Sequence, residues 1–89
     1  MNPHNPATQE STFRPLPTIE IGFYRHYKGG LYEVKALARH SEDLSAFVVY
    51  QALYGEKGLW IRPADMFIEN IIHEGVLQAR FHYLGKTLK

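Results

Sequence analysis

Residues 32–40 read YEVKALARH, and this stretch decides the fold class because apolar and polar side chains alternate along it. The even positions are apolar, namely Tyr32, Val34, Ala36 and Ala38, while the odd positions carry Glu33, Lys35 and Arg39. Only Leu37 breaks the alternation, and His40 falls on the same parity as the apolar positions. Alternation with period two is typical of a strand with one face in the core and one in water. We therefore predict a strand whose even-numbered side chains point inward.

Runs bounded by glycine or turn residues on both sides extend this strand into a predicted antiparallel meander. The preceding run, Ile21–Lys28, ends at Gly29-Gly30, a pair that supplies the positive φ of a tight hairpin. Beyond the polar turn at 40–45, the run Phe47–Tyr54 is apolar on both faces, as in a central strand. After a turn at 55–58, a fourth strand at 59–62 is ended by a proline, which cannot donate to a sheet ladder.

The remainder of the chain adds a helical turn and a last hairpin. Pro63–Phe67 suits a single helical turn, because proline is favoured at the first helical position. Residues 65–72 fit either a strand or a helix, and we favour the strand. Phe67–Ile72 and Val76–Leu84 then flank the turn at 73–75. The pattern predicts a mostly β domain: a small SH3-like barrel or a strongly curled antiparallel sheet of about five strands with one short helical turn, which would leave no exposed edges.

Length and composition indicate one domain behind a polar tail. Residues 1–18 are rich in proline and polar residues, so we predict a disordered tail there. Residues 19–89 form a single domain, because a chain of 89 residues is too short for two cores. Cysteine is absent and the N-terminal residues lack a signal-peptide pattern, so we expect a cytoplasmic protein with no membrane segment. The formal net charge of +1 does not favour nucleic-acid binding.

Ordered motifs between Gly22 and Phe81 point to a known family. They read GFYRHYKG at 22–29, YEV at 32–34, ARHSE at 38–42, VVY at 48–50, LYG at 53–55, WIRP at 60–63 and MF at 66–67, with Arg80-Phe81 closing the series. In this order and spacing the chain resembles the bacterial family named domain of unknown function 1653 (DUF1653). That family's pattern has threonine where Asp43 stands here. The resemblance implies a compact stand-alone domain of about this size. It supplies no established activity that could be carried over to this chain.

The densest polar cluster is the run 24–28, which mixes aromatic and basic residues. On a strand, Tyr24 and His26 share one face with Lys28, while Arg25 and Tyr27 lie on the other. Aromatic rings interleaved with cations can stack on bases, contact phosphates or line the pocket of an anion. The alternative is structural, with Phe23 and Tyr27 packing inward and Arg25 pairing with Glu42 or Glu69.

A second candidate is Arg62, which ends an apolar strand beside Trp60. A cation in this position is costly to desolvate unless it is paired, so it should reach a carboxylate or a bound anion. Glu42 in the His40-Ser41-Glu42 segment is the natural internal partner, and such a pair would be structural. If Arg62 instead faces an open groove with Tyr24, Tyr50 and Trp60, it is part of a binding site.

We therefore predict a non-enzymatic binding module that recognises a peptide, a protein surface or a small anionic ligand through an aromatic and basic face. The predicted face carries Tyr24, Arg25, His26, His40, Glu42, Tyr50, Trp60 and Arg62. Binding of single-stranded nucleic acid by the same residues is one alternative.

A small enzyme or metal-dependent protein using His26, His40 and Glu42 is another alternative, although no HxH or HxxxH spacing supports a metal site, and we predict neither a metal nor a cofactor. The chain could also form a homo-oligomer through Val48–Tyr54 or the last hairpin.

Overall fold

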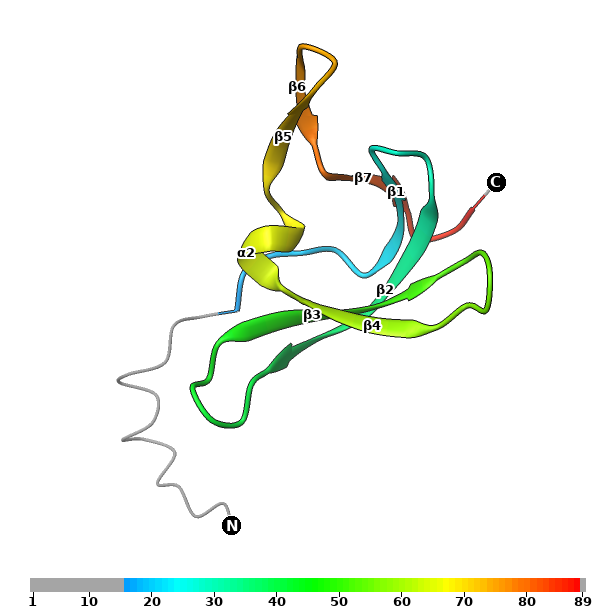
Figure 1. Ribbon diagram of the computed structural model, residues 1–89. Coiled ribbons are helices and arrows are strands. Elements are labelled where there is room, and N and C mark those ends of the chain that lie inside the picture. Colours follow the sequence, from blue (N-terminus) through cyan, green and yellow to red (C-terminus); the bar gives the residue numbers. More distant parts are fainter. Residues whose placement is uncertain (1–15, 89) are drawn as a thin grey trace.

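The computed structural model describes residues 16–88, which form seven strands and one short helix (Figure 1). In chain order these are β1 (Gly22–His26), β2 (Leu31–Arg39), β3 (Ala46–Ala52), β4 (Leu59–Pro63), α2 (Ala64–Phe67), β5 (Asn70–His73), β6 (Val76–Ala79) and β7 (Phe81–Gly85). The predicted mostly β composition and the helical turn after Pro63 are confirmed. The predicted tail at 1–18 lies almost entirely outside the described residues.

The main sheet has five antiparallel strands in the order β4-β3-β2-β1-β7. Strands β1 to β4 form the predicted meander, and β3 lies between β2 and β4 as a central strand. The hairpin from β1 to β2 turns at Gly29, whose φ of 107° is unfavourable for a residue with a Cβ atom. From the far end of the chain, β7 returns to pair with β1, where His26 lies opposite Phe81.

The register of β2 contains a bulge that the alternation of the sequence does not reveal. Val34 lies opposite Tyr50, but Ala36 lies opposite Val49, so Lys35 is an extra residue in β2. Beyond the bulge the parity reverses, and Leu37 packs against the core while Ala36 is exposed. The prediction that Ala36 and Ala38 share the inward face of Tyr32 and Val34 is therefore wrong. His40, predicted on that same buried parity, is exposed beyond the end of β2.

Strands β5 and β6 form a separate two-stranded arm that projects away from β3 and β4 (Figure 1). Its turn uses Glu74 and Gly75, whose φ values of 53° and 80° fit the positive-φ turns that join twisted strands. The predicted last strand, Val76–Leu84, is divided at Arg80: β6 belongs to the arm and β7 to the main sheet. Residues 65–72 are likewise divided between a helical turn and a strand.

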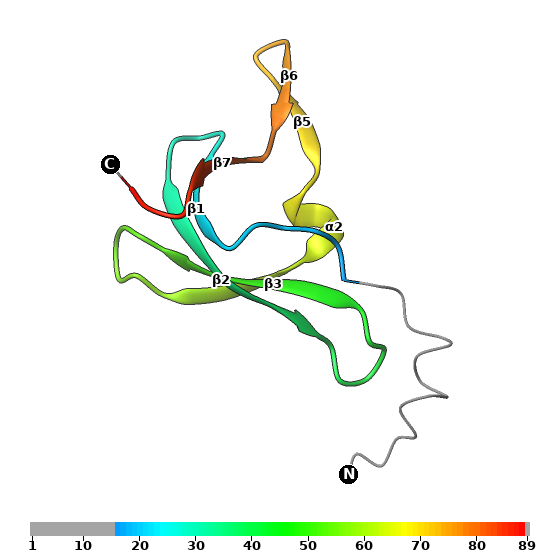
Figure 2. The same cartoon turned by 180° about the vertical axis from the view of Figure 1, so that it is seen from behind.

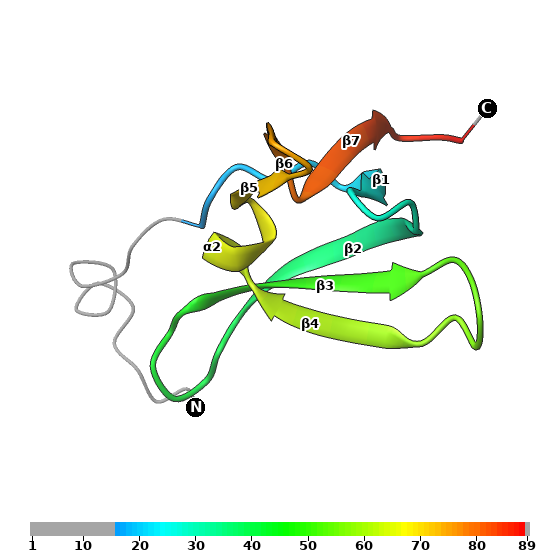
Figure 3. The same ribbon diagram turned by 45° about the horizontal axis from the view of Figure 1, so that its top comes forward.

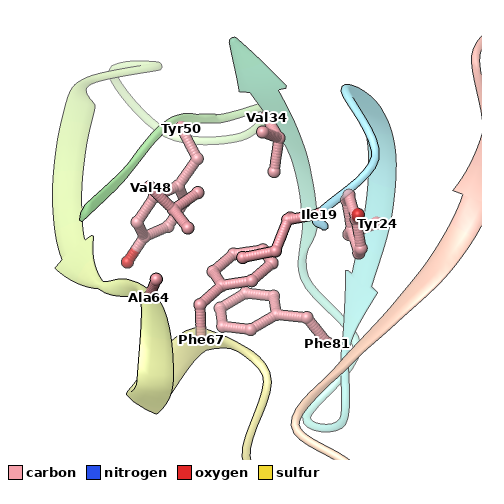
Figure 4. Packing of buried hydrophobic residues seen from close by; sticks show 8 residues of the cluster. All are labelled: Ile19, Tyr24, Val34, Val48, Tyr50, Ala64, Phe67 and Phe81. Carbon is pink, nitrogen blue, oxygen red and sulfur yellow. The ribbon is translucent and has the colours of Figure 1, made fainter. Parts of the chain in front are cut away.

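The core lies between the inner face of the main sheet and α2 (Figure 4). The rings of Phe67 from α2 and Phe81 from β7 are stacked, with centroids 4.2 Å apart and planes at 6°. Val34 and Val48 are fully buried on the sheet side of this pair. Figure 2 shows the segment before β1 passing beside α2, where Ile19 closes the other side of the core. Burial of each such side chain stabilises the fold by about 1.5–3 kcal/mol.

The main sheet does not close into a barrel, so the strands at its two ends are edges. The five antiparallel strands agree with the predicted sheet, whereas the expected loss of exposed edges is wrong. These edges are β4 on one side and β7 on the other (Figure 3). No helix within residues 16–88 is long and apolar enough to cross a membrane, and the cytoplasmic location stays a prediction.

Candidate functional site

Aromatic and basic side chains from several strands gather on the inner face of the main sheet. Residues directly opposite each other in a sheet share a face, and on this face Tyr50 lies opposite Trp60 and Val48 opposite Arg62. His26 and Phe81 form a further pair where β1 meets β7. The set made by His26, Tyr32, Tyr50, Tyr54, Arg62 and Phe81 is called the Arg62 cluster below.

Arg62 is half-buried, and its nearest partners are aromatic. Its Nε–H donates to the hydroxyl oxygen of Tyr50 over 3.2 Å, and its guanidinium carbon lies 5.7 Å from the centre of the Phe81 ring. Among residues 16–88, no carboxylate lies within ion-pair distance of Arg62. The predicted structural pair between Arg62 and Glu42 is therefore wrong. A guanidinium carries five N–H donors, so most of those on Arg62 remain available to a ligand.

Tyr32 connects the rings of the Arg62 cluster. Its ring centre lies 5.5 Å from those of Tyr50, Tyr54 and Phe81, within the usual range for aromatic pairs. Its hydroxyl is hydrogen-bonded to the hydroxyl of Tyr54. Burial, followed by this hydrogen bond, raises the pKa of Tyr32 to about 12, so the phenol stays neutral and can donate. These ring contacts thus fix the positions of the strands that surround Arg62 relative to one another.

His26 adds an imidazole ring to the cluster. Its ring lies 4.9 Å from Phe81, and its Nδ1 accepts a hydrogen bond from the backbone N–H of Lys28 over 3.1 Å. Because Nδ1 is an acceptor, the proton of the neutral ring lies on Nε2. Burial lowers the pKa of His26 first, and the positive charges of Arg62, Arg80 and Lys28 lower it further. His26 is therefore neutral at pH 7 and is surrounded by cations.

The chemistry of the Arg62 cluster is that of an anion acceptor beside aromatic surfaces. Arg62 supplies a positive charge that no carboxylate within residues 16–88 neutralises, and the hydroxyl group of Tyr50 lies beside it. Trp60 lies on the same face at the sheet edge, and 59% of its surface is exposed. A carboxylate or phosphate could accept the guanidinium donors while a flat or apolar part contacts the indole.

The structure brings together only half of the predicted face. His26, Tyr50 and Arg62 belong to the Arg62 cluster, and Trp60 lies beside it on the same face. Tyr24 lies in the core instead, where its hydroxyl donates to the backbone oxygen of Glu20 over 2.7 Å. Burial raises the pKa of Tyr24 to about 12, which agrees with a structural role.

The other three predicted residues lie elsewhere. Arg25 is exposed on the opposite face of β1, since strand residues alternate. His40 and Glu42 lie in the exposed turn between β2 and β3, where Nδ1 of His40 accepts from the backbone N–H of Glu42 over 3.0 Å. His26 and His40 flank opposite ends of β2, so the structure separates the residues of the predicted metal-dependent alternative. Within residues 16–88, no three His, Cys, Asp or Glu side chains gather to hold a metal ion.

Three members of the Arg62 cluster were missed at the sequence level: Tyr32, Tyr54 and Phe81. The alternation places Tyr32 only in the core, because its parity matches that of Val34. The strand that carries Phe81 pairs with β1, and no local pattern indicates a contact over more than fifty residues. The position of Tyr54 next to the turn glycine Gly55 is the available signal, since binding residues lie disproportionately on loops.

A hollow of about 210 Å³ lies on the other side of the core. Residues of the segment before β1, Thr18 to Glu20, form one wall, and Ile68 and Phe81 contribute to the opposite side. The hollow is lined by no cation, so it lacks the chemistry that distinguishes the Arg62 cluster.

Comparison with known proteins places the chain among proteins without a described activity. The family model described as "Protein of unknown function (DUF1653)" matches residues 22–83. The chain is also similar to a solved protein, a DUF1653 protein from Bordetella bronchiseptica, at 32% sequence identity. The alignment covers 84% of this chain and 99% of that one, with a TM-score of 0.75. No curated protein matches the chain.

Proposed function

This chain belongs to the DUF1653 family, and from the Arg62 cluster we propose that it is a non-enzymatic binding module whose ligand presents a carboxylate or phosphate to Arg62. The observation that carries the proposal is a half-buried guanidinium with aromatic neighbours and no carboxylate partner among residues 16–88. A peptide or a small molecule with such a group is the proposed ligand.

The energetics of a desolvated cation support this proposal. Removing a charge from water costs free energy unless hydrogen bonds or an opposite charge offset the loss. Tyr50 and the face of Phe81 offset only part of it for Arg62, since one is a neutral acceptor and the other a ring quadrupole. A hydrogen bond to a charged group contributes about 1.5–3 kcal/mol, so this contact alone corresponds to a dissociation constant of roughly 6–80 mM for an anion bound to Arg62.

The exposed aromatic surface beside Arg62 supports a ligand with a flat or apolar part. Trp60 and Tyr54 both expose more than half of their surface, although rings of this size usually bury most of theirs. Exposed aromatic side chains next to a cation are typical of sites that recognise peptides and small molecules. A ligand that joins an aromatic ring to a carboxylate would use both features.

Benzoate is the simplest probe of this kind, with inorganic phosphate as a second anion. In ¹⁵N-labelled protein, we expect added benzoate to shift the resonances of Arg62 Nε–H and of the Trp60 indole N–H. The variant R62Q should lose the response. R25Q is the matched control, because Arg25 is an exposed arginine on the opposite face and should leave the response unchanged.

Two results would contradict the proposal. The first is an absence of shifts at Arg62 with both anions up to tens of millimolar. The second is an equal loss of response in R62Q and R25Q, which would mean that general surface charge attracts the anion. If instead a single-stranded oligonucleotide binds much more tightly than either anion, with affinity that falls steeply as salt rises, nucleic acid is the ligand.

A further inference from the structure

β4 is an edge strand whose outward backbone groups can be assigned from its hydrogen bonds. The backbone N–H of Ala52 donates to the carbonyl of Gly58 over 3.1 Å, so Gly58 faces β3. Successive residues of a strand direct their backbone groups to alternate sides, so Trp60 and Arg62 also face β3. Leu59, Ile61 and Pro63 therefore direct theirs outward.

The outer edge of β4 is apolar. Leu59 is 65% exposed and Ile61 64% exposed, and both lie on the face opposite the Arg62 cluster. Figure 3 shows no other described element along this edge. Edge strands in stable monomers usually carry lysine, a bulge or a cover that blocks pairing. Within β4 the only charge is Arg62, whose backbone groups face inward, so this edge is open to another strand.

The sequence of β4, Leu-Trp-Ile-Arg-Pro, is complementary to itself when two copies run antiparallel with Ile61 at the centre. Each Ile61 then exchanges both backbone hydrogen bonds with the partner's Ile61, and Leu59 N–H donates to the carbonyl of the partner's Pro63. The missing N–H of Pro63 costs one bond at each end of the ladder and none at its centre. On the inner face, Arg62 lies opposite the partner's Trp60, as a cation beside an indole ring.

We propose that two copies of this chain pair through β4 about a two-fold axis at Ile61, so that Trp60 of the partner subunit completes the Arg62 cluster. The role of this tryptophan in ligand binding rests on the function proposed above, whereas the pairing itself does not. A continuous sheet across the two copies removes the apolar edge from water, and the net charge of +1 opposes association only weakly.

The area available suits a reversible dimer. Leu59, Trp60 and Ile61 are each 59–65% exposed, which corresponds to roughly 250 Å² of side-chain surface per copy for residues of this size. A standard interface takes about 800 Å² from each partner, and the backbone of β4 with Arg62 and Pro63 supplies part of the remainder. We therefore expect dissociation in the micromolar range.

Single cysteines test the register directly, because the natural chain has none. In the proposed pairing the two Ile61 Cα atoms lie about 5.5 Å apart, within the range that a disulfide bridges. The two Leu59 Cα atoms lie about 13 Å apart, since four residues of strand separate them. L59C is thus a matched control for I61C: the same strand, the same face and equal exposure.

With copper phenanthroline as the oxidant, we expect I61C to form a covalent dimer at least tenfold faster than L59C. Equal rates, or faster cross-linking of L59C, would overturn the proposed register. Light scattering on the unmodified chain is the second measurement, and it should give about twice 10.3 kDa at high concentration. A mass of one chain at every concentration would overturn the pairing.

The variant I61K separates the pairing from ligand binding, because it places two like charges at the axis. We expect a monomer whose affinity for benzoate is about three- to tenfold weaker, since each Arg62 loses the partner's Trp60. Unchanged affinity in this monomer would overturn the role of that tryptophan. A dimer with the expected cross-link that binds no anion would instead refute the proposed function and leave the pairing intact.

Discussion

Replacing Phe67 with alanine should remove a large part of the stability of the fold. Phe67 is 2% exposed, is stacked on Phe81 and contacts the rings of Tyr24 and Tyr50 at 5.2 and 5.6 Å. Truncation of a buried phenylalanine costs about 3–5 kcal/mol in unfolding free energy. A domain the size of residues 16–88 has roughly 4–11 kcal/mol in total, so F67A should leave a marginal fold.

Urea unfolding followed by circular dichroism measures this loss. F67L keeps much of the buried volume and should lose less than half as much as F67A. I68A is the local control, because Ile68 is the next residue and is 53% exposed, and its cost should stay within about 0.5 kcal/mol. If F67A and I68A destabilise the domain equally, α2 does not cover the core as described.

Two further perturbations test the surroundings of the site and the bulge. The pKa of His26 is lowered in the folded state by burial and then by Arg62, so the unfolded chain binds more protons below pH 6.5. The free energy of unfolding should therefore be highest above pH 6.5, and it should fall as the pH drops through the pKa of His26 in the folded protein. Urea midpoints of H26Q should show less of this fall, and an equal fall would remove His26 as its cause. For the bulge, L37S should destabilise the domain by about 1–3 kcal/mol and A36S by less than 0.5, because only Leu37 packs against the core; the reverse order in urea melts would contradict the register.

Local patterns in the sequence predict most of the main sheet. Glycines and polar turns bound its strands, and a run that is apolar on both faces, Phe47–Tyr54, contains the central strand β3. The bulge at Lys35 was not predictable, because an extra residue in one strand is defined only by the partner strand. The one sign of the bulge in the sequence is Leu37, an apolar residue at a position where the alternation calls for a polar one. The division at Arg80 also depends on distant pairing, since β7 finds its place only against β1.

The sequence predicts which types of residue form the candidate site better than it predicts which of them lie together. Arg62 was identified because a cation at the end of an apolar strand must be compensated. The expected partner, Glu42, lies in the exposed turn between β2 and β3. Adjacent residues of a strand point to opposite faces, so Arg25 and His26 were never able to act on one surface. Phe81 is supplied by tertiary pairing, which no pattern near Arg62 indicates.

The open sheet changes how the domain manages its edges. A closed barrel would have left no free backbone groups along β4, whereas the observed order places this strand at the end of the sheet. The same strand carries Trp60 and Arg62 on its inner face. The edge and the candidate site therefore share one short segment. Strand pairing at the edge should change ligand binding at Arg62, and ligand binding should change the pairing.

The ¹⁵N chemical shift of Arg62 Nε–H during a benzoate titration decides whether this guanidinium receives the anion of the ligand. In the free protein this group donates to the hydroxyl of Tyr50. We expect a saturable shift at Arg62, with a dissociation constant in the millimolar range, in the unmodified chain and in R25Q. A resonance that stays in place while other surface residues respond would contradict the claim that Arg62 receives the anion.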